Sequence, residues 1–238
     1  MVSMSQFQSL KQEAFEANLE LPRKGVVIYT FGNVSAIDRQ SGVFAIKPSG
    51  VPYSELKSED MVVVDLDNRV VEGKLNPSSD TRTHSFLYKH FPEIGGIVHT
   101  HSPFATAWAQ AIRSIPVYGT THADHLPCAI PCTKIMDDNA IQGDYEKATG
   151  QQIINTFKNM NYLEVEMVLV AGHGPFSWGV TAENAVYNAV MLEELAKMAF
   201  YTEQINPNSL TLKQTLIDKH YQRKHGSGAY YGQKKDDK

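Results

Sequence analysis

The sequence predicts a single domain of the α/β or α+β class, and three observations support this prediction. The chain has 238 residues, a length that suits one large domain. Apolar residues make up 42% of it and charged residues 20%, which is the composition of a folded globular protein. Helical and strand-like apolar patterns also alternate along the chain, with no internal repeat or linker between them.

The N-terminal half begins with one predicted helix and continues with short strands. In residues 5–19, apolar side chains recur three or four positions apart, which gives a helix one apolar face. Short apolar runs at 26–30 and 43–46 predict strands, and residues 61–66 predict a buried strand between turn residues. Runs this short do not fix the order of the strands in a sheet.

Capping residues mark three further helices. Ser79 or Asp80 can cap a helix that continues to about residue 91. Pro103 suits the first turn of the next helix, and Asp144 can cap a third. Residues 168–170 predict another strand, so helices and strands continue to alternate.

The C-terminal part is predicted to be helical. The longest helix is expected over residues 181–205, whose apolar side chains form a broad stripe. A last helix near 209–224 ends at Gly226. We assign residues 1–233 to the domain and residues 234–238, which mix charges, to a disordered tail.

Charge and hydropathy exclude several classes of function. The net charge is -4 and the basic residues are scattered, so no nucleic-acid-binding surface is expected. No apolar run is long enough to span a membrane, and residues 1–10 lack a signal-peptide pattern. The fragment Gly226-Ser227-Gly228 follows a helix rather than a strand, so it does not indicate a dinucleotide site. We expect a cytoplasmic protein that acts on a small molecule.

Three histidines form the strongest functional signal. The apolar pair before His99 predicts a strand, and in a strand the side chains of His99 and His101 point to the same face. His173 follows another predicted strand and lies between Gly172 and Gly174, which allow the backbone to turn. Three nitrogen ligands with one open position are typical of catalytic zinc. We favour this metal site over three separately satisfied histidines.

A second combination of ligand types is a weaker zinc candidate. His122, His125, Cys128 and Cys132 have the spacing H-x2-H-x2-C-x3-C, which could hold a structural zinc ion. We favour inert packing for the two thiols, because buried free cysteines are common. Two cysteines do not make a disulfide framework in a chain of this length, so a reducing compartment is expected.

Glycine and small hydroxyl residues gather in three segments that could bind phosphate. These are residues 32–35, 47–50 and 77–80. Backbone N–H groups and hydroxyls in such loops can contact phosphate oxygens, and Ser78 and Ser79 open a predicted helix. Each segment alone is an ordinary turn, but together with Lys47 they make a phosphate site plausible.

Longer motifs extend over nearly the whole chain, from about Leu10 to Gln233. They are GNVSA at 32–36, KPSG at 47–50, PSSDT at 77–81, GGIVHTHS at 95–102, GTTHAD at 119–124, IPCT at 130–133, GHGPFSWG at 172–179, and DKHYQRKHG with AYYGQ near the C-terminus. In these motifs the chain resembles the L-ribulose-5-phosphate 4-epimerases of the class II aldolase/adducin family. The resemblance implies one domain with a central, mainly antiparallel β-sheet flanked by helices.

The resemblance also implies a metal centre. His99, His101 and His173 are the expected ligands of one Zn²⁺ or another divalent ion, and Asp80 stands at a fourth, acidic position near the metal. The related fuculose-phosphate aldolases carry Glu at that position. Asp80 therefore favours an epimerase.

Further roles follow from the same resemblance. Asp124 and Tyr231 resemble the acid–base pair of the family. Family members form ring-shaped homotetramers with active sites between subunits, so Tyr231, His220 and Arg223 are expected to reach a neighbour's metal. The residues expected to contact a small phosphorylated sugar are Gly32, Asn33, Ser49, Gly50, Ser78 and Ser79.

The expected chemistry depends on which carbon is inverted. In a 2-ketopentose phosphate the hydrogen on C4 is not adjacent to the carbonyl, so a base cannot remove it to form an enolate. Retro-aldol cleavage of C3–C4, followed by rejoining on the opposite face, inverts C4, and zinc would act as the Lewis acid. The expected activity is the interconversion of L-ribulose 5-phosphate and D-xylulose 5-phosphate, in arabinose or ascorbate breakdown.

Two alternatives stay open. One is a class II sugar-phosphate aldolase of the fuculose-phosphate type. The other is a binding protein without catalysis, like the adducins, which the presence of all three histidines disfavours. His125 and Ala171 depart from the family pattern and concern the substrate preference.

Overall fold

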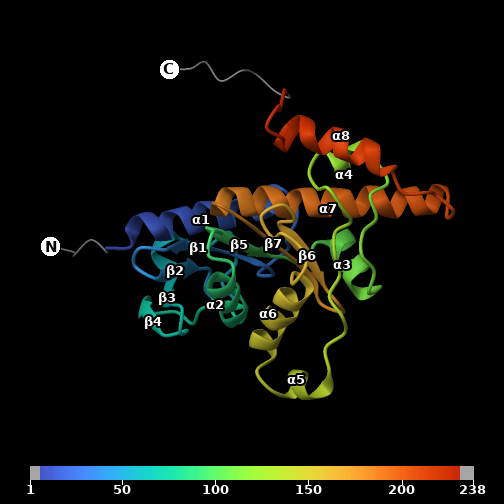
Figure 1. The fold of residues 1–238 in the computed structure, drawn as a ribbon. Coiled ribbons are helices and arrows are strands. Elements are labelled where there is room, and N and C mark those ends of the chain that lie inside the picture. Colours follow the sequence, from blue (N-terminus) through green and yellow to red (C-terminus); the bar gives the residue numbers. More distant parts are fainter. Residues whose placement is uncertain (1–5, 231–238) are drawn as a thin grey trace.

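One antiparallel sheet forms the centre of the protein (Figure 1). The computed structural model describes residues 6–230. The sheet has seven strands in the order β4-β3-β2-β1-β5-β7-β6, and every neighbouring pair is antiparallel. The strands are β1 (Asn33–Asp38), β2 (Val43–Ile46), β3 (Val62–Asp65), β4 (Val70–Glu72), β5 (Gly96–His99), β6 (Met167–Val170) and β7 (Gly174–Gly179). The single domain with a central antiparallel sheet confirms the predicted fold.

Helices cover both faces of this sheet (Figure 1). α1 and the N-terminal half of α7 pack on one face, and α2 and α6 pack together on the opposite side. α3 packs against α7 and the β6–β7 end of the sheet. The helices are α1 (Gln8–Arg23), α2 (Thr81–His90), α3 (Pro103–Gln110), α4 (Thr120–Ala123), α5 (Asp138–Gln142), α6 (Tyr145–Thr156), α7 (Ala182–Ile205) and α8 (Gln214–His225), with a short 3-10 helix at Ser58–Asp60.

Because both faces are covered, a strand can be apolar at every position. In β2, Val43 and Ala45 belong to the core beneath α1, whereas Phe44 and Ile46 belong to the core beneath α2. This explains why residues 43–46, and residues 61–64 of the strand predicted at 61–66, are uninterrupted apolar runs.

The prediction of a strand at 26–30 is wrong. Val26 and Val27 pack into the core beside α1, but the chain then turns outward, and Tyr29 has a left-handed backbone with φ of 52°. Ile28 and Tyr29 are 63% and 82% exposed. The run is apolar because it passes from the core to the molecular surface, and the strand begins only at Asn33.

The edge of the sheet at β6 is covered by an irregular segment. The N–H of Leu169 donates to the carbonyl of Pro131 at 2.9 Å, and the N–H of Thr133 donates to the carbonyl of Leu169 at 2.8 Å. The segment 130–133, which includes the IPCT motif, thus satisfies backbone groups of β6 that face away from β7.

α8 lies apart from the sheet and packs on α4 (Figure 1). Val117, Ala123 and Ile217 form a small separate core between them. Among residues 6–230, no helix has the length and apolar character needed to cross a membrane. Residues 231–238, with Tyr231 and the expected tail at 234–238, lie outside the described residues.

Candidate metal and substrate site

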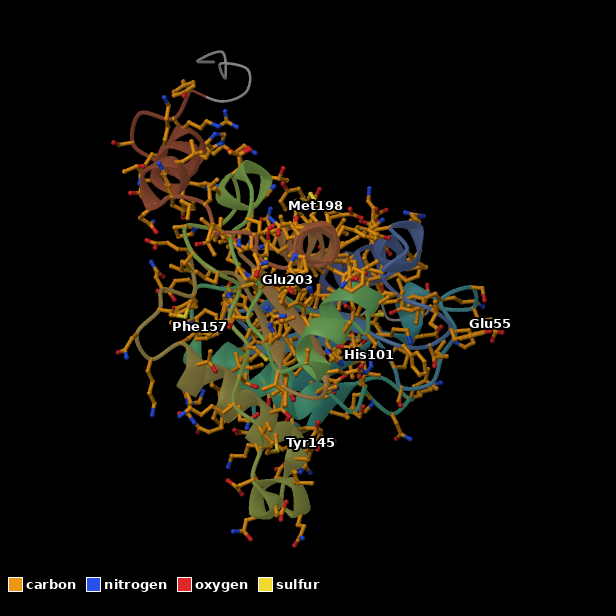
Figure 2. The ribbon with its side chains drawn as sticks, turned by 90° about the vertical axis from the view of Figure 1, so that its right-hand side faces the viewer. Glu55, His101, Tyr145, Phe157, Met198 and Glu203 are labelled. Carbon is orange, nitrogen blue, oxygen red and sulfur yellow. The ribbon has the colours of Figure 1, made fainter. Side chains whose placement is uncertain are left out.

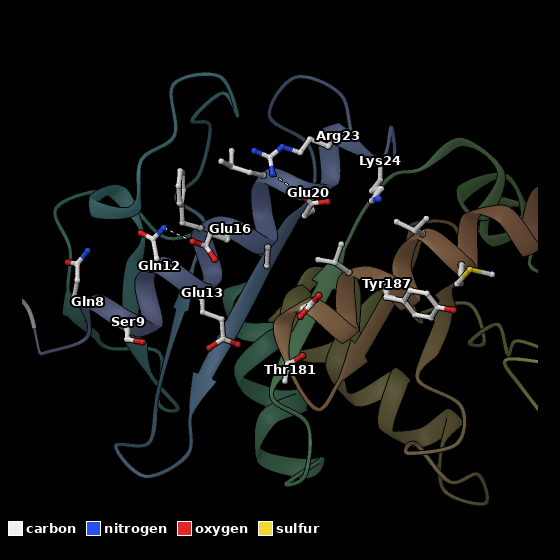
Figure 3. Close-up of a pocket in the computed structure, with 17 residues that line it drawn as sticks. Gln8, Ser9, Gln12, Glu13, Glu16, Glu20, Arg23, Lys24, Thr181 and Tyr187 are labelled. Atoms are coloured by element: carbon white, nitrogen blue, oxygen red, sulfur yellow. Dashed lines mark hydrogen bonds and ion pairs between the residues drawn. The ribbon is translucent and has the colours of Figure 1, made fainter. Parts of the chain in front are cut away.

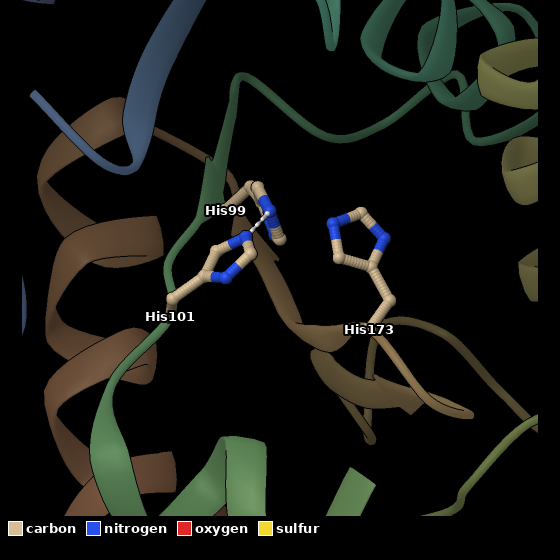
Figure 4. Close-up of side chains that lie close together, drawn as sticks. All are labelled: His99, His101 and His173. Carbon is tan, nitrogen blue, oxygen red and sulfur yellow. Dashed lines mark hydrogen bonds between the residues drawn. The ribbon is translucent and has the colours of Figure 1, made fainter. Parts of the chain in front are cut away.

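The three histidines predicted to bind metal converge at one end of the sheet (Figure 4). His99 ends β5, His101 follows it, and His173 occupies the turn between β6 and β7. β5 and β7 are antiparallel neighbours, so the end of one meets the start of the other. The ligand nitrogens all lie within 4.8 Å of one another, and Nε2 of His99 lies 3.0 Å from Nε2 of His101. The three side chains could hold one metal ion.

Neighbouring groups orient these rings. Nδ1 of His99 lies 2.9 Å from the carbonyl oxygen of Pro175, and its ring stacks on Phe176 with centroids 4.2 Å apart. Gly172 has φ of 71°, as the turn before His173 requires. A side chain at Gly174 would come within 2.9 Å of the carbonyl oxygen of Thr100. The two glycines predicted to aim His173 are therefore required by the local backbone.

Electrostatics suit a metal cation. Burial lowers the pKa of His173 to about 4, and His99 and His101 act in the same direction. Burial also lowers the pKa of His101, again assisted by His99. Neutral imidazoles offer lone pairs rather than protons, which metal binding requires. The donor set therefore fits a divalent metal.

Asp80 lies beside this cluster but is held by other partners. It is the N-cap residue of α2, yet its side chain makes no capping hydrogen bond. Its Oδ2 instead accepts from Nδ2 of Asn33 at 2.7 Å and lies 3.5 Å from Oγ of Ser78. Burial acts to raise its pKa, but His99, His84 and Asn33 outweigh burial and the pKa lies below its usual value. The lowered pKa favours the ionised carboxylate near the histidines, and its role as a fourth ligand stays a prediction.

A pocket of about 310 Å³ opens over the histidines. All ten residues predicted to bind metal or substrate line it, so the fold brings together segments far apart in the sequence. Their contact with a substrate stays a prediction. The lining residues are Thr30, Phe31, Gly32, Asn33, Lys47, Pro48, Ser49, Gly50, Ser78, Ser79, Asp80, His99, His101 and His173.

Backbone hydrogen bonds connect two of the segments predicted to bind phosphate. The N–H of Ser49 donates to the carbonyl of Asn76 at 2.9 Å, and the N–H of Ser78 donates to the carbonyl of Lys47 at 3.0 Å. The third segment approaches from β1, where a side chain at Gly32 would lie 2.9 Å from the carbonyl oxygen of His99. These contacts build the pocket wall from backbone and small side chains.

Lys47 is a charged group deep in this wall. It is 1% exposed, and its Nζ lies 3.5 Å and 3.4 Å from the carbonyl oxygens of Thr30 and Pro48. Nζ also lies 4.8 Å from the ring centroid of Tyr53. Burial lowers the pKa of Lys47 to about 8. No carboxylate pairs with it among residues 6–230, so an anion entering the pocket would meet an uncompensated positive charge.

Asp124 does not line the pocket. It follows α4 and is held by α8: His220 Nδ1 lies 2.9 Å from its Oδ1, and Arg223 donates to both of its oxygens, at 3.0 and 2.7 Å. Burial acts to raise the pKa of Asp124, but Arg223 and His220 outweigh burial and lower it. Within one chain Asp124 thus anchors α8. Its predicted partner Tyr231 lies outside the described residues.

The alternative zinc site is not assembled. In the part of the chain that is described, the His99 cluster is the only group of three or more His, Cys, Asp or Glu side chains close enough for one ion. Nε2 of His122 lies 3.0 Å from the carbonyl oxygen of Cys128 instead. Burial raises the pKa of both Cys128 and Cys132, which keeps the thiols protonated.

A larger groove, with a volume of about 1650 Å³, lies between α1 and the N-terminal half of α7 (Figure 3). Two of its four carboxylates have side-chain partners: Glu16 accepts from Gln12 at 2.8 Å, and Glu20 pairs with Arg23 at 2.7 Å. None of its lining residues belongs to the metal-binding cluster. The smaller pocket therefore contains the reactive groups.

Residues 12–200 match the family described as Class II Aldolase and Adducin N-terminal domain. The chain belongs to this family. Membership, together with the three-histidine cluster, indicates a metal-dependent enzyme of the class II aldolase type. It does not by itself specify a lyase or an epimerase.

Solved structures share the fold of this class II aldolase family member over most of its length. An L-fuculose 1-phosphate aldolase has 23% identity and a TM-score of 0.76, with 92% of this chain and 97% of that chain covered. YgbL from Escherichia coli, a putative aldolase/epimerase/decarboxylase, has 23% identity and a TM-score of 0.72, with 90% and 99% covered. The L-fuculose 1-phosphate aldolase from Glaciozyma antarctica PI12 has 15% identity and a TM-score of 0.74, with 94% and 85% covered.

Proposed function

We propose that this protein is a zinc-dependent L-ribulose-5-phosphate 4-epimerase, which interconverts L-ribulose 5-phosphate and D-xylulose 5-phosphate. The observation that carries the proposal is the convergence of His99, His101 and His173 in a pocket that also contains the buried ammonium of Lys47. A metal centre beside an anion-binding wall suits a sugar phosphate. Asp80, where fuculose-phosphate aldolases carry Glu, favours the epimerase.

The pocket residues have distinct tasks in this reaction. Lys47 and the loops at 47–50 and 76–80 hold the phosphate, which fixes one end of the substrate. The divalent ion, when bound, supplies a Lewis acid that stabilises the electrons left on the three-carbon fragment when C3–C4 breaks. The other product of cleavage is glycolaldehyde phosphate, which remains bound by its phosphate while it turns.

Inversion also needs two proton transfers. One group takes the proton of the C4 hydroxyl as the bond breaks, and a second group returns a proton to the aldehyde oxygen when the bond re-forms on the opposite face. We assign these transfers to Asp124 and Tyr231. Asp124 does not line the pocket of its own chain, which supports the proposal that a neighbouring subunit supplies it.

The mouth of the pocket supports a site between subunits. Ile28, Tyr29 and Phe31 are 63%, 82% and 54% exposed, and Phe31 lines the pocket itself. Large apolar side chains grouped in this way favour contact with another protein surface. We propose that they are covered in a homotetramer whose subunits share active sites.

Incubation with L-ribulose 5-phosphate tests the function directly. We expect D-xylulose 5-phosphate to form, formation to stop after treatment with a chelator, and activity to return with Zn²⁺. Product that forms equally well in the presence of the chelator would contradict the metal mechanism. Accumulation of a free aldehyde from a ketose phosphate would instead identify an aldolase. If the metal-loaded protein were inactive toward all such substrates, that result would favour an adducin-like binding role.

A further inference from the structure

Tyr145 contacts a predicted metal ligand and was not among the residues that the sequence identified. It is the first residue of α6 and is half-buried. Its hydroxyl lies 3.3 Å from Nδ1 of His173, and the two ring centroids are 6.0 Å apart. Figure 2 shows Tyr145 below His101, at the start of α6.

The geometry of His173 defines what this contact can do. One ring nitrogen of His173 faces His99 and His101, and the other faces away from them (Figure 4). The outward nitrogen is Nδ1, which contacts Tyr145. A metal ion on the inward nitrogen would take its lone pair, so the ring proton must then reside on Nδ1. From there it donates to the hydroxyl oxygen of Tyr145.

The two ligands with assigned partners are oriented by different means. Nδ1 of His99 is held by a backbone carbonyl inside the sheet, that of Pro175. His173 instead lies in the turn between β6 and β7, and its Nδ1 faces the side-chain hydroxyl of Tyr145. The side chain of Tyr145 therefore supplies to His173 the orientation that the sheet supplies to His99.

Hydrogen bonds from α2 hold the residues on either side of Tyr145. Arg82 of α2 donates to Oδ2 of Asp144 at 3.0 Å, and Thr83 donates to the carbonyl oxygen of Glu146 at 2.7 Å. These contacts lie on both sides of Tyr145 in the sequence. α2 begins next to Asp80, so one helix positions both the acidic side of the pocket and the partner of His173.

We propose that Tyr145 is a positioning residue that fixes the ring of His173 for metal binding and so couples the α2–α6 pair to the metal centre. This inference rests on the metal site of the proposed function. It assigns no contact with substrate to Tyr145.

The test is metal affinity rather than turnover. Competition with a chromogenic chelator gives the Kd for Zn²⁺ and Co²⁺ of the wild type, Tyr145→Phe, and the control Tyr201→Phe, whose ring is 48% exposed on α7. Loss of a partner that orients a metal-binding histidine weakens affinity by about 10-fold or more. We expect this change for Tyr145→Phe with an altered Co²⁺ visible spectrum, and no change for Tyr201→Phe. Thermal unfolding of the metal-free proteins establishes that both variants are folded.

A double-mutant cycle shows whether Tyr145 acts through His173. In a His173→Ala background, Tyr145→Phe should cause no further loss of affinity. A full additional loss there would assign the effect to general structure and overturn the inference. Equal affinities of wild type and Tyr145→Phe would also overturn it while leaving the proposed function intact. A wild type that binds neither metal would overturn both.

Discussion

The ammonium of Lys47 is buried, and it contacts two backbone carbonyl oxygens and the ring of Tyr53. Burial lowers its pKa to about 8 because a charge in the pocket wall lacks the hydration it would have in water. The charge is present below that pH and disappears above it. Such a group can bind a phosphate strongly, since the anion replaces the missing solvent.

We therefore predict that binding of a phosphorylated substrate weakens as the pH rises through about 8, where Lys47 loses its proton. KM should increase across this range with a smaller change in kcat. Lys47→Met should raise KM below pH 8 by roughly 10-fold or more and flatten the pH profile. Lys24→Met, at an exposed position, is the control. A wild-type pH profile retained by Lys47→Met would assign the titration to another group.

Residue spacing was enough to predict part of the site. His99 and His101 were predicted because i and i+2 in a strand share a face, and His173 because of its glycine neighbours. Tyr145 carried no such signal, since its contact with His173 depends on how α6 packs against α2. The burial of Lys47 is likewise a property of loop packing.

At the scale of the element, three strands were missed, β1, β4 and β7, and in β1 and β7 polar residues interrupt the apolar pattern. In β1, Oγ of Ser35 lies 2.7 Å from Nδ1 of His84 in α2. In β7, Ser177 donates to the carbonyl oxygen of Ala185 in α7 at 2.9 Å. Helices that pack on the sheet satisfy these hydroxyls, and a single-sequence pattern contains no information about such partners.

The long helix α7 was predicted over nearly its whole length, but not how closely it approaches the sheet. Gly96 and Gly179 are opposite each other in β5 and β7. A side chain at Gly96 would collide with the backbone of Ala182, and one at Gly179 would lie 2.7 Å from Cβ of Asn184. The missing side chains allow the first turn of α7 to rest on the sheet.

Gly96→Ala should therefore destabilise the fold. The collision involves helix backbone, which cannot move aside as a flexible side chain could, and we expect a loss of about 3 kcal/mol in the free energy of unfolding. Chemical denaturation measures this loss. Gly228→Ala, where no atom lies within 4 Å of the new side chain, should change stability little. Equal stability of both variants would contradict the close approach of α7.

Gly150 likewise allows a close approach, here between α6 and α2. In an exposed helix, replacement of glycine by alanine stabilises by about 1 kcal/mol. Here the new Cβ would lie 2.9 Å from Cδ1 and 3.0 Å from Cβ of Phe86, so we predict destabilisation. Because α6 carries Tyr145, Gly150→Ala should also weaken binding of Zn²⁺, as measured by chelator competition. A more stable variant with unchanged affinity would contradict this packing.

At the scale of the whole molecule, one chain separates the groups that the proposed reaction requires together. The histidines and Lys47 lie at the end of the sheet, whereas Asp124 is bound to α8. The sequence motifs indicated all of these residues as parts of one site, but within one chain Asp124 lies outside the pocket that contains the others. We predict that the assembly of subunits brings them together, which the periodicity of a single sequence does not describe.

Subunit mixing tests whether the pocket of one subunit and Asp124 of another form one active site. His101→Ala and Asp124→Asn should each be nearly inactive alone. After dissociation and joint reassembly into ring tetramers, random mixing gives about a quarter of the sites an intact pocket and an intact Asp124 from the neighbour, so about a quarter of wild-type activity should return. Two variants with different pocket substitutions should show no such recovery. Hybrid tetramers without recovered activity would place both residues in one subunit's site.

The covering of β6 has a consequence for the behaviour of the single chain in solution. An uncovered strand at the margin of a sheet offers its N–H and C=O groups to other chains and promotes intermolecular β-pairing. Residues 130–133 occupy the N–H and C=O groups of Leu169 in β6, and the strand at the opposite margin, β4, has only three residues. A single chain in solution therefore presents little template for fibrous aggregation.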